Sequence, residues 1–351
     1  MKRTKLILCI LGGLGIAVWS FFRAERSVDY RQTTGLVFGT VYHLTYRHSD
    51  DLKSEVETEL QRFDLSLSPF NEASVISKVN RNETVRPDSF FCYCFERAMQ
   101  LSRQTEGAFD ITVAPLVNAW GFGHEQTQFP DSQAVDSLRR LVGYERVSLT
   151  PEGVHKEDAR MQLTCSAVAK GYAVDVVAAL LARKGIADYM VEIGGEVVVS
   201  GKNPEGGPWR IGVNRPIEDS LSTRQDLQAV LTLTHGAMAT SGNYRNYYYR
   251  EGKKYGHTID PRTGYPVLHN LLSVTVVAED CLTADALATA FMVMGVEASL
   301  NYCLRHPEIQ AYFIVAAPSG GYEEVFTDGM RALMQPGATS AKLGDFKAGR
   351  P

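Results

Sequence analysis

Cysteine is scarce in this chain, and no strong excess of charge of one sign is present. Only six of the 351 residues are cysteine, too few for the disulfide framework that holds small secreted domains together. The 36 Lys and Arg side chains are nearly balanced by 40 Asp and Glu side chains, which gives a net charge of −4. Because nucleic-acid binding relies on a basic surface field, this balance argues against a nucleic-acid partner.

The sequence also lacks complete signatures of the common nucleotide and zinc sites. Residues 195–202 resemble a phosphate-binding loop but have one residue too many between the glycines, and Asn203 stands where Ser or Thr binds magnesium. His124 has no second His four residues later, as a zinc-binding helix requires. These departures argue against a phosphate loop and against a transition-metal site.

Long apolar runs are absent except at the amino terminus. Lys2, Arg3 and Lys5 precede the uncharged segment 6–22, which as a helix would reach roughly 25 Å, slightly less than a bilayer core. Bulky residues end this run where a cleavage site needs small ones, which favours an uncleaved anchor over a removed signal peptide. We therefore expect residues 1–26 to be a signal or membrane anchor, with the following chain on the far side of the membrane.

Helical and strand patterns alternate along residues 27–335, which excludes an all-α and an all-β fold. Apolar spacing predicts helices at Leu52–Phe63, Phe95–Thr105, Ser132–Val142, Ala169–Lys184 and Ala284–Met294. Strands are predicted at Leu36–Thr45, Tyr189–Val199, Trp209–Val213, Gln228–Thr234, Leu272–Ala278 and Ala311–Ala316, with a hairpin formed by Tyr247–Tyr249 and Tyr255–Ile259. No Pro-rich or repeated stretch interrupts this region, so we expect one compact unit with two lobes, followed by a disordered tail at residues 336–351.

One predicted helix carries two oxygen-bearing side chains that could bind a cation. Asp285 and Thr289 lie one turn apart at the start of an otherwise apolar helix. Magnesium prefers a few hard protein oxygens, a carboxylate among them. A structural role is the alternative, because Asp285 also complements the helix dipole and Thr289 can bond its own backbone.

Other polar residues stand beside glycines or turns, where a ligand can approach closely. Lys170 precedes Gly171 near a helix start and could reach a phosphate, although a lone Lys is usually a solvated side chain. Residues 240–243, Thr-Ser-Gly-Asn, offer hydroxyl, amide and N–H groups after an apolar strand. His257 precedes a turn, yet a surface His is usually inert. Residues 107–123 hold aromatic rings that suit either stacking on a flat cofactor or core packing.

Taken in their order along the chain, these segments resemble the FAD:protein FMN transferase family, the ApbE-like flavin transferases, over residues 35–334. The matching stretches are FGT (38–40), SPFNEAS (68–74), GAFDITVAPLVNAWGFG (107–123), AKGYAVD (169–175), IGGE (193–196), TSGNYRN (240–246), HTIDPRTG (257–264) and ADALATA (284–290). The resemblance implies an α+β body, with a flavin transferase domain at residues 27–335 and FAD in a cleft between its lobes. It also implies magnesium-dependent transfer of FMN from FAD to a Thr hydroxyl of a partner protein, which forms a phosphoester and releases AMP.

Residue by residue, the resemblance implies a magnesium site and an FAD site. The magnesium ligands would be the side chains of Asp285 and Thr289 and the backbone carbonyls of Ala167 and Ala288. The FAD site would be lined by Phe38, Phe70, Ala108, Phe109, Asp110, Thr164, Lys170, Ser241 and Ile259. Three positions depart from the family pattern: Phe38 replaces the usual Met, Phe70 the usual Tyr, and Thr164 the usual Asp. The third departure removes a carboxylate that could accept hydrogen bonds from FAD, so nucleotide affinity or preference is expected to differ.

The resemblance also assigns a proton acceptor, a partner and a location. His257 is expected to be the general base, since an unperturbed His pKa of about 6.5 suits neutral pH. The expected partner is an exported or membrane electron-transfer protein, which places the catalytic domain on the periplasmic or extracytoplasmic side of the bacterial inner membrane. Two alternatives stay open: an FAD pyrophosphatase that yields FMN and AMP, and an exported FAD-binding protein without catalysis.

Overall fold

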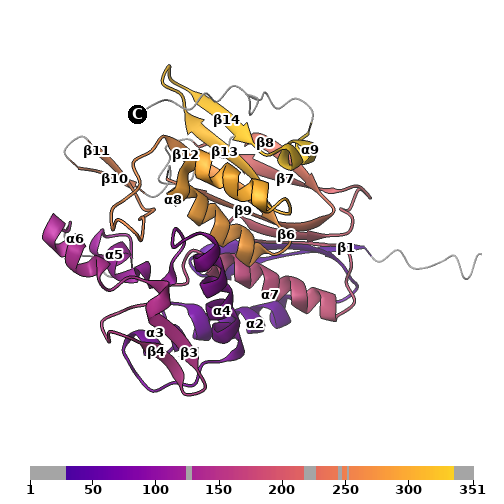
Figure 1. Ribbon diagram of the computed structural model, residues 1–351. Helices are drawn as coiled ribbons and strands as arrows, with labels where there is room; N and C mark the ends of the chain where they lie inside the picture. The colour runs from indigo at the N-terminus through magenta and orange to yellow at the C-terminus, as the bar shows by residue number, and fades with distance from the viewer. Residues whose placement is uncertain (1–28, 124–128, 217–226, 244–246, 251–252, 336–351) are drawn as a thin grey trace, which may run out of the picture.

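The computed structural model describes residues 29–123, 129–216, 227–243, 247–250 and 253–335. Helices and strands are mixed in one α+β body, as the sequence predicts (Figure 1). The expected membrane segment at residues 1–26 and the expected tail at residues 336–351 lie outside the described residues.

An eight-stranded antiparallel sheet forms the centre of this body. Its strand order is β1-β2-β5-β6-β9-β12-β13-β14. The strands are β1 (Tyr30–Val37), β2 (Thr40–Arg47), β5 (Tyr189–Ile193), β6 (Glu196–Ser200), β9 (His235–Gly242), β12 (Leu271–Ala278), β13 (Gln310–Ala316) and β14 (Tyr322–Phe326). Three two-stranded sheets pair β3 (Val147–Thr150) with β4 (Gly153–Lys156), β7 (Trp209–Asn214) with β8 (Leu227–Leu233), and β10 (Tyr247–Arg250) with β11 (Lys253–Gly256).

The longest described helices lie on one side of the sheet and supply most of the large core. The helices are α2 (Lys53–Leu67), α3 (Val75–Asn80), α4 (Ser89–Gln104), α5 (Ala114–Ala119), α6 (Ser132–Arg139), α7 (Ala169–Arg183), α8 (Cys281–Arg305) and α9 (Asp328–Leu333), with short 3-10 turns η1 (Ile111–Val113) and η2 (Tyr144–Arg146). Helices α2, α4, α7 and α8 share one buried apolar cluster with β2, β5 and β12. The opposite face of the sheet packs against β7, β8 and α9 in a second cluster.

Alternation along β6 decides which side chains face the helices. Val197 and Val199 belong to the cluster beneath β7 and β8, whereas Val198 belongs to the helix-side cluster. Since successive strand residues point to opposite faces, Glu196 at the start of β6 points to the helix side together with Val198.

The prediction of one continuous strand at residues 36–45 is wrong, because this segment contains a hairpin turn. Val37 of β1 pairs with Thr40 of β2, so Phe38 and Gly39 form a two-residue connection. Both have positive φ, 49° and 74°, as in the type I′ turn that suits the twist of a hairpin. The apolar Phe38 at the first turn position concealed this turn in the sequence.

The strand predicted at residues 189–199 is likewise two strands. Ile193 of β5 pairs with Glu196 of β6, and Gly194 and Gly195 between them have φ of 62° and 106°. These angles are accessible to glycine and strained for other residues, so the paired glycines form a tight turn.

The five predicted helices are present as α2, α4, α6, α7 and α8, with shifted ends. Gly295, expected to end the last helix, has a non-helical φ of 76°, and the helix resumes beyond it to Arg305. The predicted tyrosine hairpin is confirmed as β10 and β11, although its second strand spans residues 253–256 rather than 255–259. Within the described residues, α8 alone is long and apolar enough to cross a membrane, and 61% of its most apolar window is buried in this protein, as in a core helix.

Asp175 of α7 ties the beginning of α8 to its neighbour. Its two carboxylate oxygens accept hydrogen bonds from the backbone N–H groups of Cys281 and Leu282, each at 2.8 Å. The Asp280 side chain accepts a hydrogen bond from the next backbone N–H group, that of Thr283. Since the first N–H groups of a helix have no partner within the helix, these acidic side chains satisfy donors that would otherwise be left unpaired. Burial raises the pKa of Asp175 to about 7.

We expect Asp175→Ala to lower the free energy of unfolding by about 2–4 kcal/mol, because two partly buried N–H groups lose their acceptor. Denaturant unfolding followed by circular dichroism measures the change. Asp136→Ala on α6, where the side chain is 65% exposed, is the matched control and should change stability by less than about 0.5 kcal/mol. Equal stability of the two variants would show that Asp175 does not hold α8.

Candidate active site

Helices α7 and α8 approach each other at Gly171, and this contact brings two predicted site residues together. A Cβ at position 171 would lie 2.3 Å from the Cys281 carbonyl oxygen and 2.8 Å from Asp285 Cβ. Only glycine fits this approach. The Gly171 N–H donates to Asp285 Oδ2 at 3.0 Å, so the predicted metal ligand on α8 lies directly beside the residue that follows Lys170.

The hydrogen bond from Gly171 also affects the Ala167 carbonyl. In a regular helix the N–H of residue 171 would donate to the carbonyl of residue 167. Here that N–H is given to Asp285, and no hydrogen bond to the Ala167 oxygen is present within the described part of the chain. The structure thus frees one carbonyl next to one carboxylate, and both are among the predicted ligands.

Thr289 and Ser241 meet on the same side of the sheet. Thr289 follows Asp285 by one turn of α8 and is partly exposed, whereas its helical neighbours are buried. Its hydroxyl lies 3.2 Å from the Ser241 hydroxyl at the end of β9. Ala288 is fully buried inside α8, where its carbonyl belongs to the helical ladder, which makes it a weaker candidate ligand than Ala167.

Glu196 is the site residue that sequence analysis missed. It is 2% exposed, and its Oε1 forms an ion pair with the Lys170 ammonium. Its Oε2 is buried and has no hydrogen-bond partner. The sequence held a signal in the IGGE stretch, which places an acid directly after a glycine turn, but its burial depends on the pairing of β6 with β5 and β9.

Charge interactions keep the Lys170 amine protonated. Burial lowers the pKa of Lys170, but the attraction of Asp285 and Glu196 outweighs burial and raises it. Burial in turn raises the pKa of Glu196 to about 7, opposed by the charge of Lys170. A cation flanked by two carboxylates therefore lies between α7, β6 and α8.

The β1–β2 turn borders the same region and carries Phe38. A Cβ at Gly194 would lie 3.0 Å from Thr40 and 3.5 Å from Lys170 Cδ, so the turn, the glycine pair and Lys170 adjoin. The Phe38 ring packs 5.6 Å from the Phe63 ring, centre to centre. Phe38 also borders a groove of about 620 Å³ with both apolar and polar lining residues: Leu36, Val37, Tyr42, Glu57, Leu60, Gln61, Asp64, Leu65 and Asn71. Phe70, next to Asn71, is 77% exposed.

Three other predicted FAD residues are buried in the loop that follows α4. Ala108 and Phe109 are 1% and 3% exposed. The Asp110 carboxylate accepts hydrogen bonds from the backbone N–H and the hydroxyl of Thr112 and from the Tyr144 N–H, and burial raises its pKa. Asp110 thus has a visible structural role, and its contact with FAD stays a prediction.

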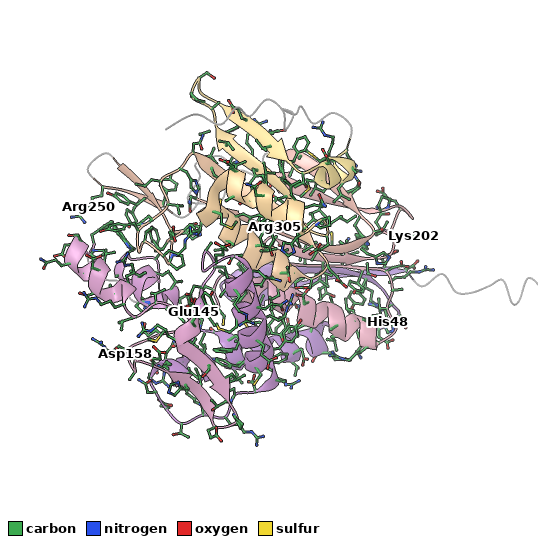
Figure 2. All side chains as sticks on the ribbon, viewed as in Figure 1. His48, Glu145, Asp158, Lys202, Arg250 and Arg305 are labelled. Atoms are coloured by element: carbon green, nitrogen blue, oxygen red, sulfur yellow. The ribbon has the colours of Figure 1, made fainter. Side chains whose placement is uncertain are left out.

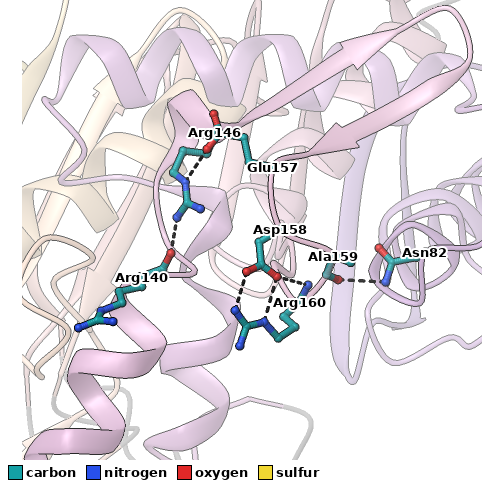
Figure 3. Close-up of polar contacts among 7 residues, drawn as sticks. All are labelled: Asn82, Arg140, Arg146, Glu157, Asp158, Ala159 and Arg160. Carbon is teal, nitrogen blue, oxygen red and sulfur yellow. Dashed lines mark hydrogen bonds and ion pairs between the residues drawn. The ribbon is translucent and has the colours of Figure 1, made fainter.

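Thr164 follows a segment that several polar contacts hold in place. Figure 3 shows that Arg160 donates a hydrogen bond to the Asp158 carboxylate. The Ala159 carbonyl accepts a hydrogen bond from the Asn82 side chain, at 3.0 Å. In the same view Arg146 binds Glu157, and its guanidinium reaches the Arg140 carbonyl. The Thr164 hydroxyl then lies 2.9 Å from the Ser166 hydroxyl, so a hydroxyl pair occupies the position where the resemblance expects an acid.

His257 lies directly after β11, beside an aromatic cluster. Its ring is 6.3 Å from the Phe122 ring. The neighbouring Thr258 donates its hydroxyl hydrogen to the Asn243 side chain at 2.8 Å, which connects this segment to the end of β9 near Ser241. Ile259 is 5% exposed and packs with Trp120.

The tyrosine hairpin extends from the same cluster. Figure 2 shows Arg250 at the tip of β10 and β11, and its guanidinium lies 4.5 Å from the centre of the Phe129 ring. The rings of Phe122 and Tyr248 stack at 4.8 Å. The hairpin is thus held by aromatic contacts close to His257.

Comparison with known proteins identifies the family of this chain. The ApbE family matches residues 38–313. The chain belongs to the ApbE family. It is 36% identical to the FAD:protein FMN transferase of Vibrio cholerae over 78% of this chain and 84% of that protein. It is 34% identical to the protein of the same name from Haemophilus influenzae, over 86% of this chain and 91% of that one.

Solved ApbE structures share the fold. Flavin transferase ApbE from Vibrio cholerae superposes with a TM-score of 0.77 at 33% identity, over 87% of this chain and 99% of that one. The apo form of flavinyl transferase ApbE from Pseudomonas stutzeri gives 0.77 at 32% identity, over 89% of this chain and 98% of that one. The family predicted from the motifs is therefore confirmed.

The contact at Gly171 should not tolerate a side chain in this ApbE member. Gly171→Ala is expected to lower the free energy of unfolding by about 1–3 kcal/mol, since its Cβ meets backbone rather than a flexible side chain. Urea unfolding measures the loss. Gly207→Ala, whose Cβ would have no neighbour nearer than 3.9 Å, is the control. A stability gain for Gly171→Ala would contradict the close approach of α7 and α8.

Proposed function

We propose that this protein is a magnesium-dependent FAD:protein FMN transferase that modifies a Thr hydroxyl of a partner protein. As a member of the ApbE family it is a flavin transferase, and relatives that cover most of its length are named FAD:protein FMN transferases. One observation carries the finer proposal. Lys170, Asp285 and Thr289 converge where α7 and α8 meet, with a free carbonyl at Ala167.

The donor set at this meeting point fits magnesium. Asp285 Oδ2 binds Gly171, which leaves Oδ1 for a cation. The Thr289 hydroxyl and the Ala167 carbonyl add two hard, uncharged oxygens, and magnesium is commonly held by one carboxylate and a few such groups. When bound, magnesium would neutralise charge on the FAD pyrophosphate.

The surrounding residues can hold FAD in an extended pose. The groove beside Phe38 has apolar lining residues, and the exposed ring of Phe70 lies in sequence directly before its lining residue Asn71; such groups suit the flat flavin ring. The protonated Lys170 then lies near the magnesium site, where it can bind pyrophosphate oxygens. The Ser241 hydroxyl beside Thr289 offers a further donor. FAD would thus lie across the region that joins the β1–β2 turn to α7 and α8.

The reaction requires a proton acceptor near the attacking hydroxyl. The Thr oxygen attacks the FMN phosphorus, the bond to the AMP oxygen breaks, and the Thr proton must leave. We assign the proton to the imidazole of His257, which the Thr258–Asn243 hydrogen bond connects to the end of β9. Asp260 is less suited to orient that ring, since both of its oxygens bind Arg262.

We further propose that the partner is an exported or membrane electron-transfer protein. The basic residues and apolar run at the amino terminus support this, because they would keep the domain on the periplasmic or extracytoplasmic side of a bacterial inner membrane. Enzyme and acceptor would then share one membrane surface.

A transfer assay tests the chemistry directly. After incubation of residues 27–351 with FAD, magnesium and a Thr-containing acceptor, we expect a mass gain of one FMN on the acceptor. Asp285→Asn should slow transfer at least about 100-fold, since it removes the only charged metal ligand, whereas Asp136→Asn should not. Free FMN and AMP with an unmodified acceptor would indicate an FAD pyrophosphatase, and intact bound FAD would indicate a storage protein.

The role of His257 has its own test. His257→Gly should slow transfer by about 10²–10⁴, the usual contribution of a general base, while FAD affinity stays within about twofold. Single-turnover mass spectrometry and fluorescence titration with FAD measure the two quantities. His155→Gly, at the exposed position of strand β4, controls for loss of a histidine. Transfer at the normal rate in His257→Gly would exclude it as the base.

A further inference from the structure

The buried carboxylate of Glu196 is the feature that the proposed chemistry leaves unexplained. Burying an acid whose second oxygen has no partner is costly, and native proteins contain few such groups. Glu196 is 2% exposed, with Oε2 unpartnered. A side chain kept under these conditions at the border of a site needs a role beyond packing, because an apolar residue of similar size would fill the space without the penalty.

The pairing of Lys170 indicates what that role is. Two carboxylates, Asp285 and Glu196, both attract its ammonium and raise its pKa. The ion pair, however, forms with Glu196, and none forms between Lys170 and Asp285 within the described residues. In this structure the ammonium therefore pairs with Glu196 and not with Asp285.

The choice matters because Asp285 is the only charged ligand in the proposed magnesium site. An ammonium bound to Asp285 would compete with the cation for Oδ1, since Oδ2 is already held by Gly171. With the ammonium held on Glu196, Oδ1 stays available and the positive charge of Lys170 points to where the FAD phosphates would lie. Outer partners of this kind commonly change metal affinity 10- to 100-fold.

We propose that Glu196 is a positioning residue that holds Lys170 away from Asp285 and so keeps the carboxylate open for magnesium. This inference rests on the proposed function, because it assumes the magnesium site there. It adds a residue that touches neither the metal nor the reacting atoms and acts through Lys170. The backbone supports the role: the Gly194–Gly195 turn and the pairing of β6 with β5 and β9 fix Glu196 on the helix side of the sheet.

Calorimetric titration with Mg²⁺, repeated with Mn²⁺, measures the effect without catalysis. Glu196→Gln keeps the shape of the side chain and removes its charge, so the freed ammonium should bind Asp285 and weaken cation affinity about 10- to 100-fold. Glu196→Asp, which keeps the acid, should recover part of that loss. Wild-type affinity in Glu196→Gln would overturn the proposal.

A double-mutant cycle separates action through Lys170 from any other action of Glu196. In a Lys170→Met background no ammonium competes for Asp285, so adding Glu196→Gln should change cation affinity less than about twofold. An equal loss in both backgrounds would overturn the positioning role, since it would mean that Glu196 acts on the cation independently of Lys170. If the wild-type protein bound neither cation, the magnesium site itself would be wrong and this inference would fall with it.

Glu324 supplies a matched control on the same fold. It is also a buried acid, 7% exposed, with an unpartnered Oε2, but it lies on β14 at the far edge of the sheet. Glu324→Gln should leave cation affinity unchanged. A similar loss in Glu324→Gln and Glu196→Gln would show a general effect of removing a buried charge and would overturn the proposal. Circular dichroism melts of each variant confirm folding, and Glu196→Asp supplies the test if Glu196→Gln does not fold.

Discussion

The close approach of α7 and α8 is the constraint on which the site depends. Gly171 allows the two backbones to meet, and its N–H binds Asp285 rather than closing the helical turn onto Ala167. Asp175, one turn further along α7, holds the first N–H groups of α8. One face of α7 therefore sets the distance and the register between the two helices and leaves the oxygens of the proposed metal site free. The chemistry of that site follows from how the two core helices pack.

The central sheet serves this helix pair by presenting residues from its turns and strand ends. The Phe38–Gly39 turn, the Gly194–Gly195 turn and the end of β9 each place a few polar or aromatic groups beside α7 or α8. Phe38 has a positive φ although it is not glycine, and such strained positions gather at functional sites. Turns with fixed geometry on a rigid sheet can position ligand-binding groups more precisely than long loops.

Positive and negative side chains alternate at the site, so it is not a simple basic pocket. Lys170 lies between two acids and stays protonated because of them, while burial favours the neutral form of each acid. A bound cation would stabilise the charged form of the carboxylates, and an anionic nucleotide would stabilise the Lys170 ammonium. In the proposed function, this arrangement would let one small region bind both magnesium and a diphosphate, which a surface of a single sign could not do.

The sequence by itself determined the family, the mixed fold class and most helices, because motif order and apolar spacing are local properties. The i, i+4 spacing of Asp285 and Thr289 is likewise local, and it was enough to propose them as cation ligands on α8. It did not reveal the hairpin turn at Phe38, since a bulky apolar residue there resembles strand interior. Nor could it assign Glu196, which adjoins Lys170 only because β6 pairs within the sheet and α7 crosses above it. The burial of Glu196, its ion pair with Lys170 and the free Ala167 carbonyl depend on contacts between residues distant in sequence. Only the tertiary structure therefore decided them.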